Sequence, residues 1–410
     1  MAEQNISFSP VMLKATGTPF ENLPTKENPP APQGGVVNST PTLLLLGERE
    51  SETVRAYGLS GENETVISAP AADLADEVLN GMSFGLHISS GSGKIAISAP
   101  YRDIKFYNES GVWVNTKYGT GAVYLYDKNN LDGSFVTIRA NEADQGLSHY
   151  QNFGQCTQIV GDKIYVGAPG YNSSFGAIYT YNLDGTNETK YVSNSQVAFG
   201  QKFVVTDQYI FVGVPYHNSN NKGGVGAIYR YPLDWSNVEI IQPNVKITNG
   251  RFGHNFSVVG NKIYVAHLSS NTNHFYSFDL DGNNEQIITT AGSTKLGYSA
   301  ISATSSKVCV GSYSENTAYV FDLNPDGSVN PNNPLVISPS GVNTGDAFGY
   351  NVTLDESVNK LCVSAGGDDT QASNGGAVYI FDLDGTLINK VNGTTVGGRI
   401  GQDIGNISFA

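Results

Sequence analysis

The chain has 410 residues, a formal net charge of −14 and only 15% charged residues. A surface this acidic repels phosphate backbones, so nucleic acid is not an expected partner. No apolar run reaches the roughly 20 residues of a membrane helix, and the start MAEQNISFSP lacks the basic and apolar regions of a secretory signal, so we expect neither membrane insertion nor that export route.

The first segment, residues 1–41, carries seven of the 17 prolines and shows neither a helical nor a strand period. Such a segment is extended, and an ordered proline-rich arm needs a surface to lie on. We therefore expect an arm that docks on other proteins of an assembly, and the alternative is that it wraps its own domain. Its apolar anchors are Phe8, Val11, Leu13, Phe20 and Leu23.

After residue 41 one sequence unit recurs along the chain. Each unit begins with a pair of a large apolar residue and glycine, and the pairs recur every 44 to 69 residues. A period near 50 is typical of one four-stranded propeller blade. The pairs are Phe84-Gly85, Phe153-Gly154, Phe199-Gly200, Phe252-Gly253, Leu296-Gly297, Phe348-Gly349 and Ile400-Gly401.

Two strands can be recognised inside each unit. The second strand is a short apolar run such as KIYVG at Lys163, which is typical of a strand buried on both faces near a propeller axis. The third strand alternates around a central tyrosine, as in GAIYTY at Gly176, which predicts a half-buried strand. Asp-Gly turns follow the third strand at Asp132, Asp184, Asp281, Asp326 and Asp384.

Six complete units leave one blade of the ring to be assembled from both ends of the chain. Residues 399–410 begin like a first strand and stop, whereas residues 42–70 read as strands two to four. We therefore predict an all-β fold, a seven-bladed β-propeller over residues 42–410, closed by pairing of its N- and C-terminal segments. The alternative is a β-solenoid or a sandwich.

The repeat resembles the FG-GAP repeat of the integrin α-subunit propeller. The Phe-Gly pairs provide one half of the motif, and VGAP (166–169), ISAP (97–100) and VGVP (212–215) provide the other. The resemblance implies a seven-bladed propeller and a role in adhesion, scaffolding or ligand binding. The last repeats depart from it, with VAHL at Val265, VGSY at Val310 and VSAG at Val363.

The calcium loops of many family members are missing from the corresponding connections. The connection between the first two strands is only VGDK (160–163) or VGNK (259–262), too few oxygens for Ca²⁺. We therefore expect no metal site and no cofactor. The Asp-Leu-Asp-Gly runs that start at Asp279 and Asp382 are interpreted as turns.

Loops between strands two and three open on one rim of a propeller, together with the four-to-one connections. The longest of them spans residues 101–120 and is rich in aromatic side chains, which supply contact area at little entropic cost. We expect this rim to bind a host-surface protein or a glycan, and the alternative is that the loop packs over its own blade. The rim residues are Tyr101, Tyr107, Trp113, Tyr118, Tyr171, Tyr216, His217, Tyr313, Asp368 and Asp369.

No pattern of residues predicts catalysis, so we expect no catalytic residues. The favoured function is a non-enzymatic structural or adhesive propeller, similar to a bacteriophage virion protein that decorates capsid or tail or contacts the host receptor on the particle surface. One alternative is a bacterial adhesin on the cell surface. The other is a propeller glycan hydrolase or lyase, for which only Asp368–Asp369 and Glu142–Asp144 offer carboxylate pairs.

Overall fold

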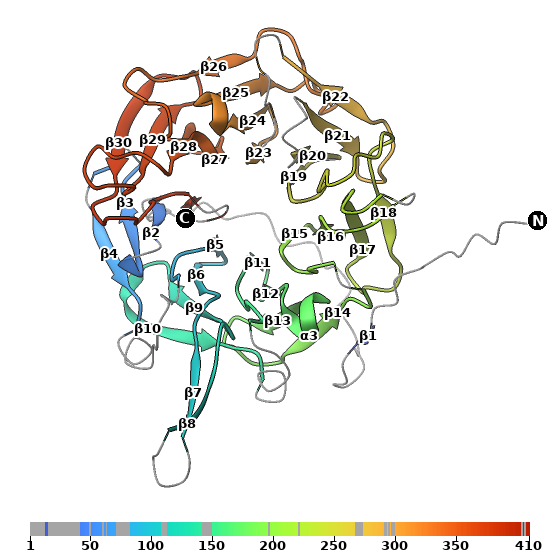
Figure 1. Ribbon diagram of the computed structural model, residues 1–410, viewed down its shortest axis with the longest axis vertical. Helices are drawn as coiled ribbons and strands as arrows, with labels where there is room; N and C mark the ends of the chain where they lie inside the picture. The colour runs from blue at the N-terminus through green and yellow to red at the C-terminus, as the bar shows by residue number, and fades with distance from the viewer. Residues whose placement is uncertain are drawn as a thin grey trace, which may run out of the picture.

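The fold is given by a computed structural model. It describes residues 13–14, 42–48, 51–59, 61–62, 64–70, 83–107, 113–141, 150–195, 197–219, 222–266, 274–290, 293, 296, 300–402, 405 and 407–410. Within these residues, seven antiparallel sheets follow one another around a central axis, so the predicted seven-bladed β-propeller is confirmed (Figure 1).

Each blade has four strands, and the first strand of each lies nearest the axis (Figure 1). The blades, from inner to outer strand, are blade 1, β31 (Ile407–Phe409), β2 (Leu44–Glu48), β3 (Thr53–Tyr57) and β4 (Thr65–Ser68); blade 2, β5 (Ile88–Gly91), β6 (Lys94–Ala99), β9 (Ala122–Asp127) and β10 (Asn130–Ile138); blade 3, β11 (Thr157–Val160), β12 (Lys163–Ala168), β13 (Ala177–Asn182) and β14 (Thr189–Val192); blade 4, β15 (Lys202–Val205), β16 (Tyr209–Val214), β17 (Ala227–Pro232) and β18 (Glu239–Ile241); blade 5, β19 (Asn255–Val259), β20 (Lys262–Ala266), β21 (Phe275–Asp279) and β22 (Gln286–Ile288); blade 6, β23 (Ile301–Ala303), β24 (Lys307–Ser312), β25 (Thr317–Asp322) and β26 (Leu335–Ile337); and blade 7, β27 (Phe348–Asp355), β28 (Lys360–Ala365), β29 (Ala377–Asp382) and β30 (Leu387–Asn392).

In four blades, the phenylalanine of the repeat packs against the central tyrosine of the third strand. The ring of Phe153 lies 5.2 Å from that of Tyr179, and Phe348 lies at the same distance from Tyr379, both pairs edge to face. A recurring glycine brings the next blade close: Gly176 (φ +83°) forms a parallel bridge with Phe199, and a Cβ on it would lie 2.2 Å from the Phe199 carbonyl oxygen. Only glycine allows so close an approach, which explains why glycine recurs at this position of the repeat.

Two details of the strands differ from expectation. The third strands are buried on both faces, as in β9, β17 and β29, because neighbouring blades cover them, so the prediction of a half-buried strand is wrong. Asp132 lies inside β10, where the register shifts between Asn130 and Phe135, and the turn before it is formed by residues 128–129. The prediction of a turn at Asp132 is therefore also wrong.

The ends of the propeller segment meet in blade 1. Strand β31 pairs antiparallel with β2, with Leu44 opposite Phe409 and Leu46 opposite Ile407. Leu43 and Ala410 continue the ladder by exchanging two backbone hydrogen bonds of 2.8 and 2.9 Å. The predicted closure by the N- and C-terminal segments is confirmed, and it leaves no unpaired strand edge between the ends of the ring.

A few elements lie outside the regular blades. Strand β1 (Leu13–Lys14) pairs with the outer strand β14, so this part of the arm lies on blade 3 of its own chain. Strands β7 (Ile104–Tyr107) and β8 (Trp113–Lys117) form a hairpin that projects away from the ring (Figure 1). Short turns of helix are α3 (Tyr171–Ser174) and η2 (Tyr313–Glu315). Within the described residues, no helix has the length and hydropathy to cross a lipid bilayer.

Candidate functional site

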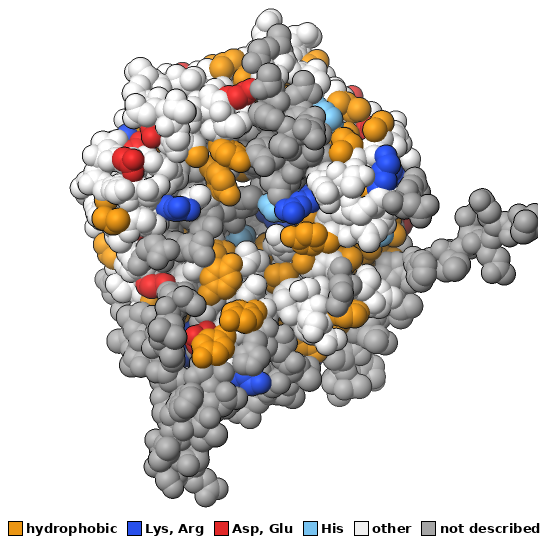
Figure 2. Space-filling model, in the orientation of Figure 1, with side chains coloured by type: hydrophobic (Ala, Val, Ile, Leu, Met, Phe, Trp, Pro, Cys, Tyr) orange, Lys and Arg blue, Asp and Glu red, His pale blue; other side chains and the backbone are white. Residues whose placement is uncertain are grey.

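The face onto which the 2–3 loops and the 4–1 connections open is here called the top face. On it, over blade 3 and the adjoining edges of blades 2 and 4, lies a groove of about 670 Å³, which we call the rim groove. Figure 2 shows hydrophobic side chains gathered on this side of the central hollow. The groove is lined by Tyr101, Tyr150, Asn152, Gln155, Pro169, Gly170, Ser174, Ala198, Gln201 and Tyr216.

Two tyrosines of the rim groove are strongly exposed. Tyr150 is 61% and Tyr216 44% exposed, unusual values for aromatic side chains. The Tyr118 ring stacks on Tyr150 at 6.4 Å, and the Arg251 guanidinium lies 5.4 Å from the centre of the Tyr216 ring. These contacts hold both rings in fixed orientations, with surface left for a ligand.

The backbone beside the groove is held in a costly conformation. Asn172, Ser173 and Ser174 have φ values of +47°, +58° and +72°, so three successive residues without glycine adopt left-handed angles. Each such residue costs roughly 1–2 kcal/mol. Strain of this kind clusters at binding sites, where the surrounding structure maintains it.

A second cavity, the axial cavity, opens where the rim groove meets the axis of the ring. It has a volume of about 160 Å³ and is lined by Leu86, His87, Gln155, Gln201, Lys202, His254 and Tyr350. Gln155 and Gln201 line both cavities, so the two adjoin. Figure 2 shows basic and histidine side chains together at the central hollow.

The two histidines of the axial cavity are neutral at neutral pH. Burial, with a smaller contribution from the Lys202 charge, lowers the pKa of His87 to about 3. Burial, followed by the Arg251 and Lys202 charges, lowers the pKa of His254 to about 4. The Nδ1 atom of His87 accepts the backbone N–H of Thr157 at 3.4 Å, which places the ring proton on Nε2.

Lys202 is the cation whose charge contributes to the lowered pKa of both histidines. It stands at the start of β15 and lines the axial cavity as well as a deeper one of about 200 Å³ along the axis. In the part of the chain that the structure describes, its ammonium has no ion pair. A half-buried charge in this situation favours an anion as ligand.

Two predicted rim residues are buried beneath the top face instead. Tyr171 accepts a hydrogen bond from Lys190 at 3.0 Å, and Asp368 pairs with Lys390 at 2.8 Å. Both lysines lie on the fourth strand of a blade and reach over the third-strand tyrosine to the 2–3 loop. The expectation that Tyr171 and Asp368 are exposed for binding is therefore wrong, because each fastens its loop to its own blade.

The remaining predicted rim residues are dispersed. Tyr101 and Tyr216 line the rim groove, and Tyr118 supports Tyr150 from below. His217 is half-buried with Nδ1 2.8 Å from the Tyr229 hydroxyl, Tyr313 packs on Tyr350, and Asp369 accepts the backbone N–H of Asn374.

Several predicted residues cannot be compared with the structure at the level of side chains. Tyr107 and Trp113 are paired in the projecting hairpin, and their side chains lie outside the described residues, as does that of Leu13. Phe8, Val11, Phe20 and Leu23 of the arm, together with Glu142 and Asp144, lie outside the described residues altogether.

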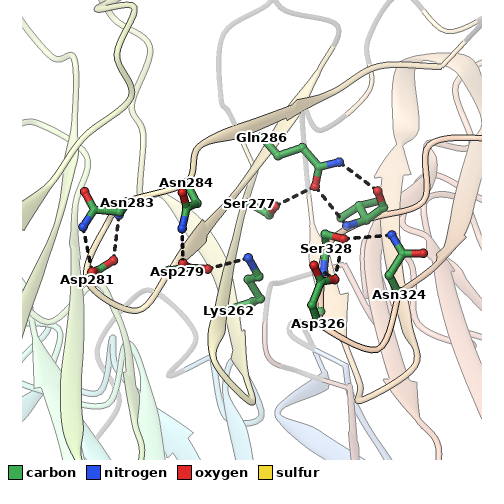
Figure 3. A network of polar contacts seen from close by, with 12 residues as sticks. Lys262, Ser277, Asp279, Asp281, Asn283, Asn284, Gln286, Asn324, Asp326 and Ser328 are labelled. Atoms are coloured by element: carbon green, nitrogen blue, oxygen red, sulfur yellow. Dashed lines mark hydrogen bonds and ion pairs between the residues drawn. The ribbon is translucent and has the colours of Figure 1, made fainter.

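The Asp-Gly segments form turns whose carboxylates are already engaged (Figure 3). Asp279 accepts hydrogen bonds from Lys262 at 2.5 Å and from Asn284 at 2.6 Å, which lower its pKa. Asp281 accepts the backbone N–H of Asn283 at 2.9 Å. Within the described residues, no group of three or more acidic, histidine or cysteine side chains could hold a metal ion.

Sequence reasoning missed Tyr150, Asn152, Gln155, Gln201 and Lys202 as site residues. A usable signal was present, because these residues flank the Phe-Gly pairs at Phe153 and Phe199. The position after the glycine lines the axial cavity in four blades, with Leu86, Gln155, Gln201 and His254, and Tyr350 does so in a fifth. The repeat thus places one side chain per blade around the same opening.

Comparison with known proteins supports the repeat and the fold. Residues 336–381, which span β26 to β29, match the family model of the FG-GAP repeat. No curated protein matches the sequence. Among solved structures, the chain is similar to a functionally unknown protein from Desulfotomaculum acetoxidans DSM 771, with a TM-score of 0.55 and 13% identity over 90% of this chain and 98% of that one. It is also similar to the dihydro-heme d1 dehydrogenase NirN in complex with DHE, with a TM-score of 0.48 and 11% identity over 90% of this chain and 75% of that one.

Proposed function

We propose that this propeller is a non-enzymatic adhesive module that binds a glycan in the rim groove. The observation that carries the proposal is the groove itself, with two strongly exposed tyrosines beside several amide side chains. Flat aromatic rings cover the apolar faces of sugars, and amides donate to and accept from hydroxyl groups in fixed directions. A few oriented polar groups in a concave aromatic surface are typical of a ligand site.

The architecture suits binding without turnover. The groove residues come from the connections of three successive blades, and the packed sheets beneath hold them in place. Among the described residues that line the rim groove and the axial cavity there is no carboxylate, whereas glycoside hydrolysis ordinarily uses a pair of carboxylates.

Replacing Tyr150 or Tyr216 by Ala is expected to weaken glycan binding about fivefold for each, since a lost stacking contact is worth about 1 kcal/mol. Isothermal titration calorimetry against the tightest ligand from a glycan panel measures this. Phe135→Ala is the matched control, because Phe135 is an exposed aromatic residue on the outer strand β10. Equal affinities for the tyrosine variants and the wild type would refute the groove as the binding site.

The same proposal places the module in a larger assembly, of which a bacteriophage virion is the setting we favour. Its support is the proline-rich composition of residues 1–41, of which Leu13–Lys14 pairs with the outer strand of blade 3.

Deleting residues 1–41 is expected to leave the ring folded and to abolish incorporation into particles, because only the two-residue strand β1 is lost from a blade. Circular dichroism checks the fold, and immunoblotting of purified particles checks incorporation. Truncated protein in the particles would contradict docking through the arm, and full-length protein in the host envelope instead of particles would contradict the virion setting.

A further inference from the structure

The rim groove and the axial cavity form one continuous depression with two chemically different ends. The rim end presents Tyr150 and Tyr216, and the axial end presents Lys202 and His254. Gln155 and Gln201 lie at the boundary, since both line each cavity. A ligand that stacks on the rim tyrosines therefore points one end toward the axis.

The axial end is positively charged in a chain with a net charge of −14. Lys202 lines the cavity together with His87 and His254, and its charge contributes to the lowered pKa of both histidines. Among the described residues that line the cavity, none is acidic. Because the rest of the surface carries an excess of acidic residues, this local excess of positive charge indicates a site for an anion.

Neutral donors complete the site. His87 is only 8% exposed, and its Nδ1 is taken by Thr157, so its Nε2–H is left to donate. The side-chain amides of Gln155 and Gln201 supply further N–H groups. A volume of about 160 Å³ corresponds to about five water molecules, which is sufficient for a carboxylate, sulfate or phosphate group.

We propose that the ligand of this face is an acidic glycan whose anionic group occupies the axial cavity on Lys202, with His87 and the two glutamines as neutral donors. This inference rests on the proposed glycan-binding function and adds the class of ligand. The sugar rings lie on Tyr150 and Tyr216, and the charge of the ligand fixes which end enters the axis.

The test uses the full chain and pairs of ligands that differ only in the anionic group. The pairs are sialyllactose and its carboxyl-reduced form, tetragalacturonate and its carboxyl-reduced form, and a carrageenan tetrasaccharide sulfate and its desulfated form. Calorimetry is run on the wild type, on Lys202→Met, which keeps side-chain length without charge, and on Lys222→Met. Lys222 is an exposed lysine in the 2–3 loop of blade 4, so it controls for charge in general.

We expect at least one acidic ligand to bind the wild type at least tenfold more tightly than its neutral partner. The Lys202→Met variant should lose this preference, while its affinity for the neutral partner stays within about twofold of the wild-type value. The Lys222→Met variant should retain the preference. Lys202→Arg, which restores a cation, should recover most of it. Which pairs show the preference separates a carboxylate from a sulfate ligand.

Two outcomes would overturn the inference, and they can be distinguished. Equal binding of acidic and neutral partners, unchanged in Lys202→Met and weakened by Tyr150→Ala, would leave the glycan-binding function standing without the anion site. Absence of binding by every ligand would remove both proposals. Thermal melts of each variant confirm that a loss of affinity is not a loss of fold.

Discussion

Replacing Glu48 by Ala is expected to lower the free energy of unfolding by about 3–5 kcal/mol, because it removes the buried one of the two carboxylates that pair with Arg55. Glu48 ends β2 and is fully buried. Its Oε2 accepts Arg55 Nε at 2.9 Å and lies 2.8 Å from Arg55 Nη2. Its Oε1 accepts the backbone N–H groups of Thr394 and Thr395 at 3.2 and 3.1 Å.

This single carboxylate therefore joins blade 1 to the connection that follows the last strand of blade 7. The change to Ala leaves both backbone N–H groups without this acceptor, which adds to the cost of removing the buried partner of Arg55. Urea unfolding followed by circular dichroism measures the effect as a shift of the midpoint at constant slope.

Glu64→Ala is the matched control, since Glu64 pairs with the same Arg55 at 3.1 Å but is 41% exposed on its side chain. It should cost less than about 1 kcal/mol, as surface ion pairs do. If the two variants lost equal stability, the closure would not depend on the Glu48 contacts.

Asp368→Asn is expected to destabilise the fold by about 2 kcal/mol at pH 7. The side chain is 2% exposed and its Oδ2 lies 2.8 Å from Lys390 Nζ, while Oδ1 accepts the Thr370 N–H at 2.9 Å. Asparagine keeps the shape and leaves the ammonium without its counter-charge. The cost is smaller than for a fully buried pair because Lys390 is partly open to water.

The pH dependence of this loss follows from the pKa of Asp368. Burial alone would raise that pKa, but the hydrogen bonds from Lys390 and Thr370 outweigh burial and bring it below the ordinary value of 3.8. The stabilisation is therefore complete above the pKa of the unfolded chain and is lost as pH falls through the lower folded value. Wild type and variant should differ fully at pH 7 and converge once the pH falls below the lowered folded pKa of Asp368.

Urea midpoints of both proteins across this pH range test the expectation. Asp369→Asn, at the exposed neighbouring carboxylate, should change stability by less than about 0.5 kcal/mol at every pH. A constant difference between wild type and Asp368→Asn down to the lowest pH would show that the ion pair is not its cause.

The architecture could be predicted from the sequence because it is repetitive and local. Four of the Phe-Gly pairs mark the same contact with the central tyrosine of a third strand, so several copies of one signal supported each other. Closure by β31 and β2 followed from counting strands. The burial of the third strands was missed because the alternation of residue types along one strand contains no information about the neighbouring blade that packs on its second face.

The site was less predictable because it is assembled across blades. Tyr101 and Tyr216 were predicted because their loops are rich in aromatic residues. Tyr150 lies in a connection that has no such aromatic pattern, and it lines the same groove only because the blades are arranged in a ring. Tyr171 and Asp368 had the expected residue types, but lysines on the fourth strands hold them in the interior. Such pairing between distant positions has no signature in one sequence.

The central claim is that the top face binds an acidic oligosaccharide across two joined cavities. A crystal structure of the chain with the acidic oligosaccharide that binds most tightly tests this claim most directly. The account predicts sugar rings against Tyr150 and Tyr216 and the anionic group within hydrogen-bond distance of Lys202 Nζ. Density on the opposite face or along the outer strands, or an anionic group turned toward solvent at the rim, would contradict it.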